Sequence, residues 1–217
     1  GSSDDTVAIC KKLNATVIET DWAGYGINKN KGIAAAKNDW ILSLDADEAI
    51  DEELQNSLQQ LSSGDETEVF NIRFKNFYCN RWIRFGEWGF DRHIRLFNRK
   101  KIQWNTADVH ENLVFPERIK VTLLPGHILH YTVRNRKEYA DKMVSYARMN
   151  ANKYFDAGKK NSFFKQYFSP AFAFIQHYVF RLGFLDGRDG FIIAKTTAWY
   201  TFLKYRYLKE LNNNSEL

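Results

Sequence analysis

The sequence predicts an α/β fold, a doubly wound sheet followed by an all-helical C-terminal extension. Three patterns predict it. Short apolar runs alternate with helical segments over residues 3–61, as in strand-helix-strand units. Apolar and polar residues then alternate over residues 68–131, as in half-buried strands, and beyond residue 135 the apolar spacing becomes helical. We therefore expect a core at residues 1–131 and a helical extension at residues 132–217.

The composition suits one substantial core with an appendage, because the chain has 217 residues of which 44% are hydrophobic. The net charge of +5 favours anionic partners, namely sugar nucleotides, phospholipid head groups or nucleic acid. No nucleic-acid-binding motif accompanies the charge, so we expect no nucleic acid partner. Cys10 and Cys79 have no metal-ligand spacing, which indicates a reducing compartment and no disulfide framework.

The N-terminal elements read as parts of strand-helix-strand units. Residues 3–13 predict an amphipathic helix that Ser3 caps, residues 15–19 a β-branched strand, and residues 27–37 an Ala-rich helix. Because the chain opens on a helix cap, we expect it to begin in mid-domain. Lys29 falls near the start of its helix, where backbone amides and a cation favour phosphate, although an exposed helix lysine is the more common occurrence.

The first concentration of chemistry follows a short apolar run. Residues 40–44 predict a buried strand, and Asp45, Asp47 and Glu48 come directly after it. In an open α/β sheet ligands bind at the carboxyl ends of strands, and two carboxylates in extended chain can converge on Mg²⁺ or Mn²⁺. The alternative is an acidic turn in which Asp47 or Asp51 caps the helix predicted at residues 51–61.

The second half of the core reads as strands at residues 69–78, 92–97, 118–124 and 127–131, the last two separated by a Pro-Gly turn. The aromatic loop at residues 82–90 either stacks on a sugar or covers the core.

A second concentration of titratable groups lies at residues 105–112. His110 can complete a metal site begun by the two aspartates, and Glu111 can serve as a general base. Without the first motif, this His-Glu pair would read as a surface turn.

The extension predicts helices at residues 137–156, 167–180 and 191–208. The middle one is uncharged and aromatic but shorter than the ~20 apolar residues that span a bilayer. Basic residues flank it, so it suits a helix lying in a membrane interface, and it equally suits a buried packing helix.

Several segments together resemble a known family. Those that resemble inverting GT-A glycosyltransferases of family 2 are Ser3-Asp4-Asp5-Thr6, Gly24-Tyr25-Gly26-Ile27-Asn28-Lys29-Asn30 and Trp40-Ile41-Leu42-Ser43-Leu44-Asp45-Ala46-Asp47-Glu48. Those that look like the bacterial branch building lipopolysaccharide core and related surface glycans are Arg95-Leu96-Phe97, Val109-His110-Glu111, His130-Tyr131 and Leu185-Asp186-Gly187-Arg188-Asp189-Gly190. The resemblance covers nearly the whole chain and implies a GT-A-like fold. Family members open with a strand, a helix and a second strand, so it also implies an N-terminally truncated core.

The resemblance implies a hexosyltransferase-type enzyme that transfers a sugar, with inversion, from a nucleotide-sugar donor to a lipid-linked glycan acceptor. We expect the donor to be a UDP-sugar. Asp45 and Asp47 would hold a divalent metal on the donor diphosphate, with His110 as third ligand and Lys29 as phosphate contact. Glu111 would deprotonate the acceptor hydroxyl. The alternative is a non-catalytic remnant or interaction module of the same fold. A D-x-D also opens haloacid-dehalogenase phosphatases, but Ala49 stands where those proteins have Thr or Val.

The same resemblance sets the expected location. A lipid-linked acceptor lies at a membrane, and sugar nucleotides are cytosolic. We therefore expect a cytoplasmic enzyme, peripheral on the inner face of the cytoplasmic membrane, with the anionic membrane surface as a further partner.

Overall fold

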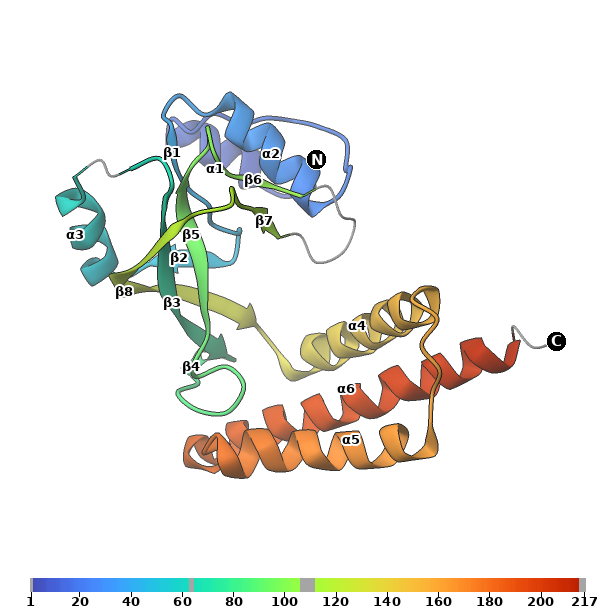
Figure 1. Ribbon diagram of the computed structural model, residues 1–217. Helices are drawn as coiled ribbons and strands as arrows, with labels where there is room; N and C mark the ends of the chain where they lie inside the picture. The colour runs from blue at the N-terminus through green and yellow to red at the C-terminus, as the bar shows by residue number, and fades with distance from the viewer. Residues whose placement is uncertain (1, 63–64, 106–111, 215–217) are drawn as a thin grey trace. The chain divides into compact units, whose positions relative to one another are not determined.

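The computed structural model describes residues 2–62, 65–105 and 112–214 (Figure 1). The chain divides into two compact units. Unit 1 comprises Gly1–Ser43, Leu61–Asn71 and Ile94–Leu123, and unit 2 comprises Leu44–Gln60, Ile72–His93 and Leu124–Leu217. This division follows contacts within the chain, and the expected boundary between residues 131 and 132 stays a prediction.

The described residues form an α/β fold with a helical C-terminal region, which confirms the predicted class. The strands are β1 (Trp40–Leu42), β2 (Glu48–Ile50), β3 (Glu68–Tyr78), β4 (Arg81–Trp82), β5 (Arg92–Asn98), β6 (Gln103–Trp104), β7 (Leu113–Val114) and β8 (Lys120–Val133). The α-helices are α1 (Thr6–Lys12), α2 (Tyr25–Ala35), α3 (Glu52–Gln60), α4 (Arg136–Asp156), α5 (Phe163–Ile175) and α6 (Gly187–Asn214). A π-helical turn, η1 (Gln176–Phe180), and a 3₁₀ turn, η2 (Gly183–Asp186), join α5 to α6.

The main sheet has the strand order β1-β5-β3-β8-β2, and β4 pairs with β3. β1 pairs with β5 antiparallel, with Ile41 opposite Phe97. β2 pairs with β8 antiparallel, with Glu48 opposite His130. β6 and β7 form a separate two-stranded ribbon. The strand pairings of β1 and β2 therefore differ from the parallel neighbours expected of a doubly wound sheet.

Three local predictions are wrong. Residues 15–19 form neither helix nor strand, because β-branched residues become a strand by pairing with a neighbour, and the sheet order includes no strand there. The Pro-Gly at residues 125–126 does not separate two strands but lies inside the single strand β8. There Gly126 takes φ +94°, which a glycine adopts without strain. The short strand β2 lies where no strand was predicted, because three residues are too few to show alternation.

Unit 1 is held by a cluster of side chains from α2, β3, β5, β6 and the turn before β6: Ile33, Val69, Phe97, Ile102 and Trp104. Asn30 on α2 fixes β6, since its amide nitrogen donates to the carbonyl of Trp104 at 2.8 Å and its amide oxygen accepts from the Trp104 N–H at 3.0 Å. A guanidinium nitrogen of Arg99 donates to the carbonyl of Ala36 at 2.6 Å, beyond the last turn of α2. Such partners satisfy carbonyls that a helix end leaves unpaired.

Unit 2 has its own cluster, which includes Tyr78, Ile83, Val133, Tyr139 and Ile193. Trp88 from the aromatic loop packs edge-on against Tyr139 with ring centroids 5.6 Å apart, so at Trp88 that loop covers the core, as the second of its two readings predicted. α6 packs against both α4 and α5, and Figure 1 shows α5 and α6 running alongside each other.

The Leu185–Gly190 segment has a structural role in unit 2. The buried carboxylate of Asp186 accepts hydrogen bonds from the backbone N–H groups of Arg84 at 3.1 Å and Phe85 at 2.8 Å. Gly190 lies so close to η2 that a Cβ atom there would be 1.9 Å from the carbonyl oxygen of Gly183. This segment therefore fastens the start of α6 to the loop after β4.

Candidate functional site

The two aspartates of the D-x-D lie in a tight turn between β1 and β2. The N–H of Glu48 donates to the carbonyl of Asp45 at 3.0 Å, and the Glu48 carboxylate accepts from the N–H of Asp45 at 2.9 Å. The predicted extended conformation is therefore wrong, because these two bonds close a β-turn with Asp47 at its third position. The N–H of Tyr131 on β8 donates to the carbonyl of Asp47 at 2.9 Å and anchors the turn to the sheet.

His130 lies opposite the Asp47 carboxylate. Its Nε2 atom is 3.4 Å from Oδ2 of Asp47, and its Nδ1 atom is 2.9 Å from Oδ1 of Asn76. The amide nitrogen of Asn76 donates to the carbonyl of Trp88 at 3.0 Å and faces Oδ2 of Asp91 at 3.3 Å. The orientation of the amide is therefore fixed, with Oδ1 as the acceptor.

This network decides the tautomer of His130. Because Asn76 Oδ1 accepts, Nδ1 of His130 carries the proton that is donated, and in the neutral ring Nε2 presents a lone pair toward Asp47. Two electron-rich atoms facing each other repel unless a cation, either a proton on Nε2 or a metal ion, lies between them. This arrangement fits a divalent metal, for which carboxylate oxygen and imidazole nitrogen are ordinary ligands. Adjacent ligands of an octahedral ion lie roughly 3 Å apart, close to the separation seen here.

Asp91 supports the orientation of Asn76. Burial raises the pKa of the Asp91 carboxyl, but hydrogen bonds from His93 and Asn76 outweigh it and hold that pKa below its usual value. His93 Nε2 lies 2.7 Å from Oδ1 of Asp91. The carboxylate stays ionised at neutral pH and remains an acceptor for the Asn76 amide.

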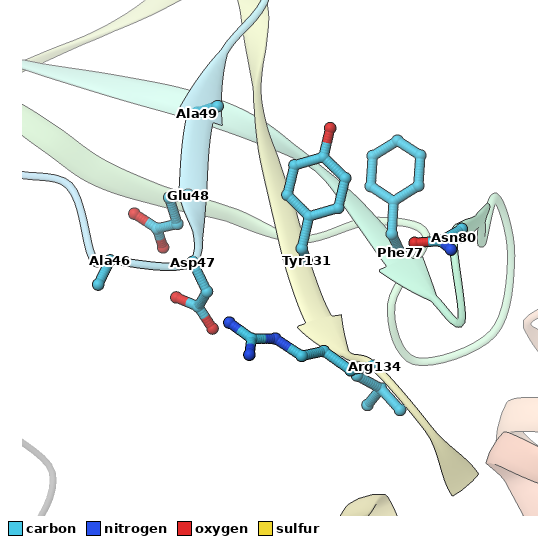
Figure 2. A pocket seen from close by; sticks show the side chains of 9 residues that line it. Ala46, Asp47, Glu48, Ala49, Phe77, Asn80, Tyr131 and Arg134 are labelled. Carbon is cyan, nitrogen blue, oxygen red and sulfur yellow. The ribbon is translucent and has the colours of Figure 1, made fainter. Parts of the chain in front are cut away.

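A pocket of about 590 Å³ opens beside the turn in unit 2. It is lined by Ala46, Asp47, Glu48, Ala49, Phe77, Asn80, Tyr131, Val133 and Arg134. The rings of Phe77 and Tyr131 stack with centroids 4.9 Å apart and planes 19° apart, which forms an aromatic wall. Figure 2 shows the Arg134 side chain extending toward the Asp47 carboxylate. Carboxylates, a guanidinium and an aromatic face are the groups that recognise a sugar phosphate.

A second group of potential ligands has another use. Ligand atoms of Asp51, Glu53 and His127 lie within 4.8 Å of one another. The Asp51 oxygens already accept from the N–H groups of Leu54 at 3.0 Å and His127 at 2.9 Å, and Lys75 Nζ lies 3.0 Å away. Burial raises the pKa of Asp51, but these partners outweigh it and lower that pKa to about 2. Asp51 therefore caps α3, as the alternative reading of the acidic segment predicted.

The structure brings only some of the predicted site residues into one unit. Asp45 and Asp47 share the turn in unit 2. Lys29 belongs to unit 1, where its Nζ lies 4.5 Å from the ring centroid of Trp104. His110 and Glu111 lie outside the described residues, so the third metal ligand and the base stay predictions.

Several residues of the site carried no assigned role in the sequence analysis, among them Asn76, His130, Tyr131 and Arg134. His130 and Tyr131 entered only as part of the resemblance. The available signal was Asn76, which falls on the inward face of β3 between Phe74 and Tyr78, because an amide at an inward position requires partners.

Comparisons with known proteins identify the family of this chain. Residues 1–118 match Glycosyl transferase family 2. An uncharacterized glycosyltransferase of Rickettsia typhi is 30% identical over 99% of this chain and 77% of its own length. One of Rickettsia felis is 30% identical over 96% of this chain and 77% of its own. The lipopolysaccharide core biosynthesis glycosyltransferase LpsC of Rhizobium meliloti is 28% identical over 94% of this chain and 77% of its own. Because the family match covers more than half of the chain, this protein belongs to glycosyl transferase family 2, with a GT-A-like fold, and is a transferase.

Proposed function

We propose that this protein transfers a sugar, with inversion, from a nucleotide-sugar donor to a lipid-linked glycan of the cell envelope, and that the transfer depends on a divalent metal. The observation that carries the proposal is the Asp47 carboxylate facing His130 Nε2 at 3.4 Å, beside a pocket lined by the Arg134 guanidinium and the rings of Phe77 and Tyr131. The donor proposed is a UDP-sugar. The relative named for lipopolysaccharide core biosynthesis supports an acceptor of that class.

Asp47 and His130, which face each other at 3.4 Å, would hold the metal, which is Mg²⁺ or Mn²⁺, and the resemblance adds Asp45 as a ligand. His130 joins this set from the geometry, and His110 remains a predicted further ligand. When bound, the ion supplies Lewis-acid stabilisation to the departing nucleotide diphosphate. Asn76 and Asp91 keep His130 in the tautomer that exposes Nε2 to the site.

The remaining groups bind and orient the substrates. Arg134 lines the pocket and suits a phosphate oxygen, as does Lys29 by the resemblance. The stacked Phe77 and Tyr131 offer an apolar wall against which a sugar ring can pack. Glu111 would accept the proton of the attacking acceptor hydroxyl, so that the oxygen attacks the anomeric carbon as the nucleotide leaves. Because the donor is cytosolic and the acceptor is lipid-anchored, we place the reaction at the inner face of the cytoplasmic membrane.

Isothermal titration with Mn²⁺ and UDP tests the proposed metal and donor. The protein should bind Mn²⁺, and Mn²⁺ should strengthen UDP binding. Asp47→Asn should weaken both, since it removes an anionic ligand. Glu53→Gln is the matched control, because it makes the same chemical change in the Asp51 group and should leave Mn²⁺ binding unchanged. If Mn²⁺ binding is lost in Glu53→Gln and kept in Asp47→Asn, the metal binds at the group of Asp51, Glu53 and His127, and the proposed site is wrong. A chain that binds neither Mn²⁺ nor UDP is instead the non-catalytic module.

A further inference from the structure

α5 and the turn of η1 leave a row of large apolar side chains open to solvent. Phe164 is 65% exposed, Phe168 55% and Phe172 61%, and Ile175 and Val179 extend the row. The spacings of four, four, three and four residues put them on one face of a helix. We call these five residues the α5 stripe. Side chains of this size exposed together, rather than singly, mark an interaction surface.

The α5 stripe is not the face by which α5 packs on the rest of unit 2. That role belongs to other residues. Phe174 and Tyr178 both pack edge-on against Phe191 of α6, at 5.8 Å and 5.7 Å between ring centroids. Tyr167 reaches Phe202 of α6 at 5.9 Å. The helix therefore has a packed face already, and the α5 stripe is additional apolar surface.

Apolar side chains continue from the stripe through the turns that join α5 to α6. Phe180 is 72% exposed, and Leu182, Phe184 and Leu185 are also exposed. The turns themselves are hydrogen-bonded, since the N–H of Arg181 donates to the carbonyl of Gln176 at 2.9 Å and that of Leu185 to Leu182 at 2.9 Å. The exposed side chains thus sit on an ordered backbone rather than on a loose loop.

The charge of this region has one sign. Residues 157–185 include four basic residues, Lys159, Lys160, Lys165 and Arg181, and no acidic residue. Asp186, which follows directly, is 4% exposed and directs its carboxylate to backbone N–H groups. The surface that borders the α5 stripe therefore attracts anions.

We propose that the α5 stripe and the apolar turn after it dock on the anionic phospholipid surface of a membrane, with α5 lying along the interface. Aromatic side chains enter the boundary between head groups and acyl chains, and Lys165 and Arg181 meet the lipid phosphates. In the described part of the chain, no helix is long and apolar enough to cross a bilayer.

Charge decides between a membrane and a second copy of the chain. Two copies joined through the α5 stripe would bring like charges together, because residues 157–185 offer no acidic partner. An anionic lipid surface neutralises the same charges. This inference stands on the surface of unit 2 and does not depend on the sugar-transfer proposal.

Flotation with phospholipid vesicles tests it. The protein should float with vesicles containing 30% phosphatidylglycerol at low salt, less with phosphatidylcholine alone, and less at 0.5 M NaCl. Phe168→Ser with Phe172→Ser should lower the partition coefficient more than about tenfold. Lys165→Glu with Arg181→Glu should lower it by at least about fivefold for each charge lost.

Matched controls make exchanges of the same kind in unit 1. Ile9→Ser with Leu13→Ser removes exposed apolar residues, and Lys11→Glu with Lys12→Glu reverses two charges. Both should leave flotation unchanged, and circular dichroism should show all four variants folded. The proposal is overturned if the wild-type protein stays unbound at low salt, or if the α5 variants float as well as the controls. It is also overturned if sedimentation shows a dimer that Phe168→Ser with Phe172→Ser abolishes. Mn²⁺ and UDP binding should persist in the α5 variants, so failure here is distinct from failure of the proposed function.

Discussion

The Nδ1 atom of His130 lies 2.9 Å from Oδ1 of Asn76, a residue that is 4% exposed and does not itself line the pocket. The amide of Asn76 is in turn held by the carbonyl of Trp88 and by Asp91. Asn76 is therefore a positioning residue for His130 Nε2. Removal of a positioning residue of this kind typically lowers metal affinity by 10- to 100-fold, about 1.4 to 2.7 kcal/mol.

The first prediction follows from this contact. Asn76→Leu keeps the branched shape of the side chain but removes the acceptor for Nδ1. Mn²⁺ affinity measured by calorimetry should therefore fall by about 10- to 100-fold. The midpoint of thermal unfolding reports separately on any loss of packing. Unchanged Mn²⁺ binding in a folded Asn76→Leu protein would remove His130 from the metal site.

The second prediction separates the D-x-D from the base. Asp47→Asn should weaken metal and nucleotide binding together. Glu111→Gln should leave donor binding nearly intact and lower turnover by about 10²-fold or more, the usual contribution of a positioned base. Calorimetry measures the binding, and single-turnover transfer from a UDP-sugar measures the rate. Full transfer activity in Glu111→Gln would show that another group takes the proton.

How far the sequence predicts the site depends on the range of the interactions. Asp45 and Asp47 are found from the sequence because the acidic run is local and follows an apolar strand. The turn that holds them is not predicted, although it is also local, because the acidic run does not show that the Glu48 carboxylate accepts from the Asp45 N–H. His130 meets Asp47 through the pairing of β2 with β8, a contact across more than eighty residues that no local pattern records.

The fold shows the same division. The helices of the extension follow from apolar spacing over long segments, although α6 runs from Gly187 to Asn214 and is longer than predicted. The failures are short elements whose conformation is set by partners. β2 has three residues and exists by pairing with β8, and residues 15–19 have strand-forming side chains without a paired strand. The continuous path of β8 through Pro125 depends on a close approach to α3.

That approach gives the third prediction. A Cβ atom at Gly126 would lie 2.2 Å from the backbone nitrogen of Leu54, and the residue has φ +94°. Gly126→Ala should lower the free energy of unfolding by about 3 kcal/mol or more, since backbone atoms must move. Gly158→Ala is the control: it has φ +68° with nothing within 4 Å of the added Cβ, so only conformational strain of about 1 kcal/mol applies. Urea unfolding of both variants measures the difference. Equal losses would mean that α3 yields to the added methyl.

The last prediction concerns acid stability and Asp51. Its pKa of about 2 in the folded protein lies below the ordinary value of 3.8, because the N–H groups of His127 and Leu54 and the ammonium of Lys75 outweigh the effect of burial. A depressed pKa stabilises the fold fully above pH 3.8, and the stabilisation is lost as pH falls toward 2. It amounts to about 2 kcal/mol at neutral pH.

Asp51→Asn keeps a helix cap but removes the charge, so it should be less stable than wild type at pH 7 by about that amount. Urea unfolding between pH 7 and pH 2.5 should show the two proteins converging as pH falls. Glu53→Gln, two residues further along the chain, is the control: its free energy of unfolding should change with pH in parallel with that of wild type. A constant gap between Asp51→Asn and wild type across that range would mean that the carboxylate stabilises α3 through its shape as a cap and not through its charge.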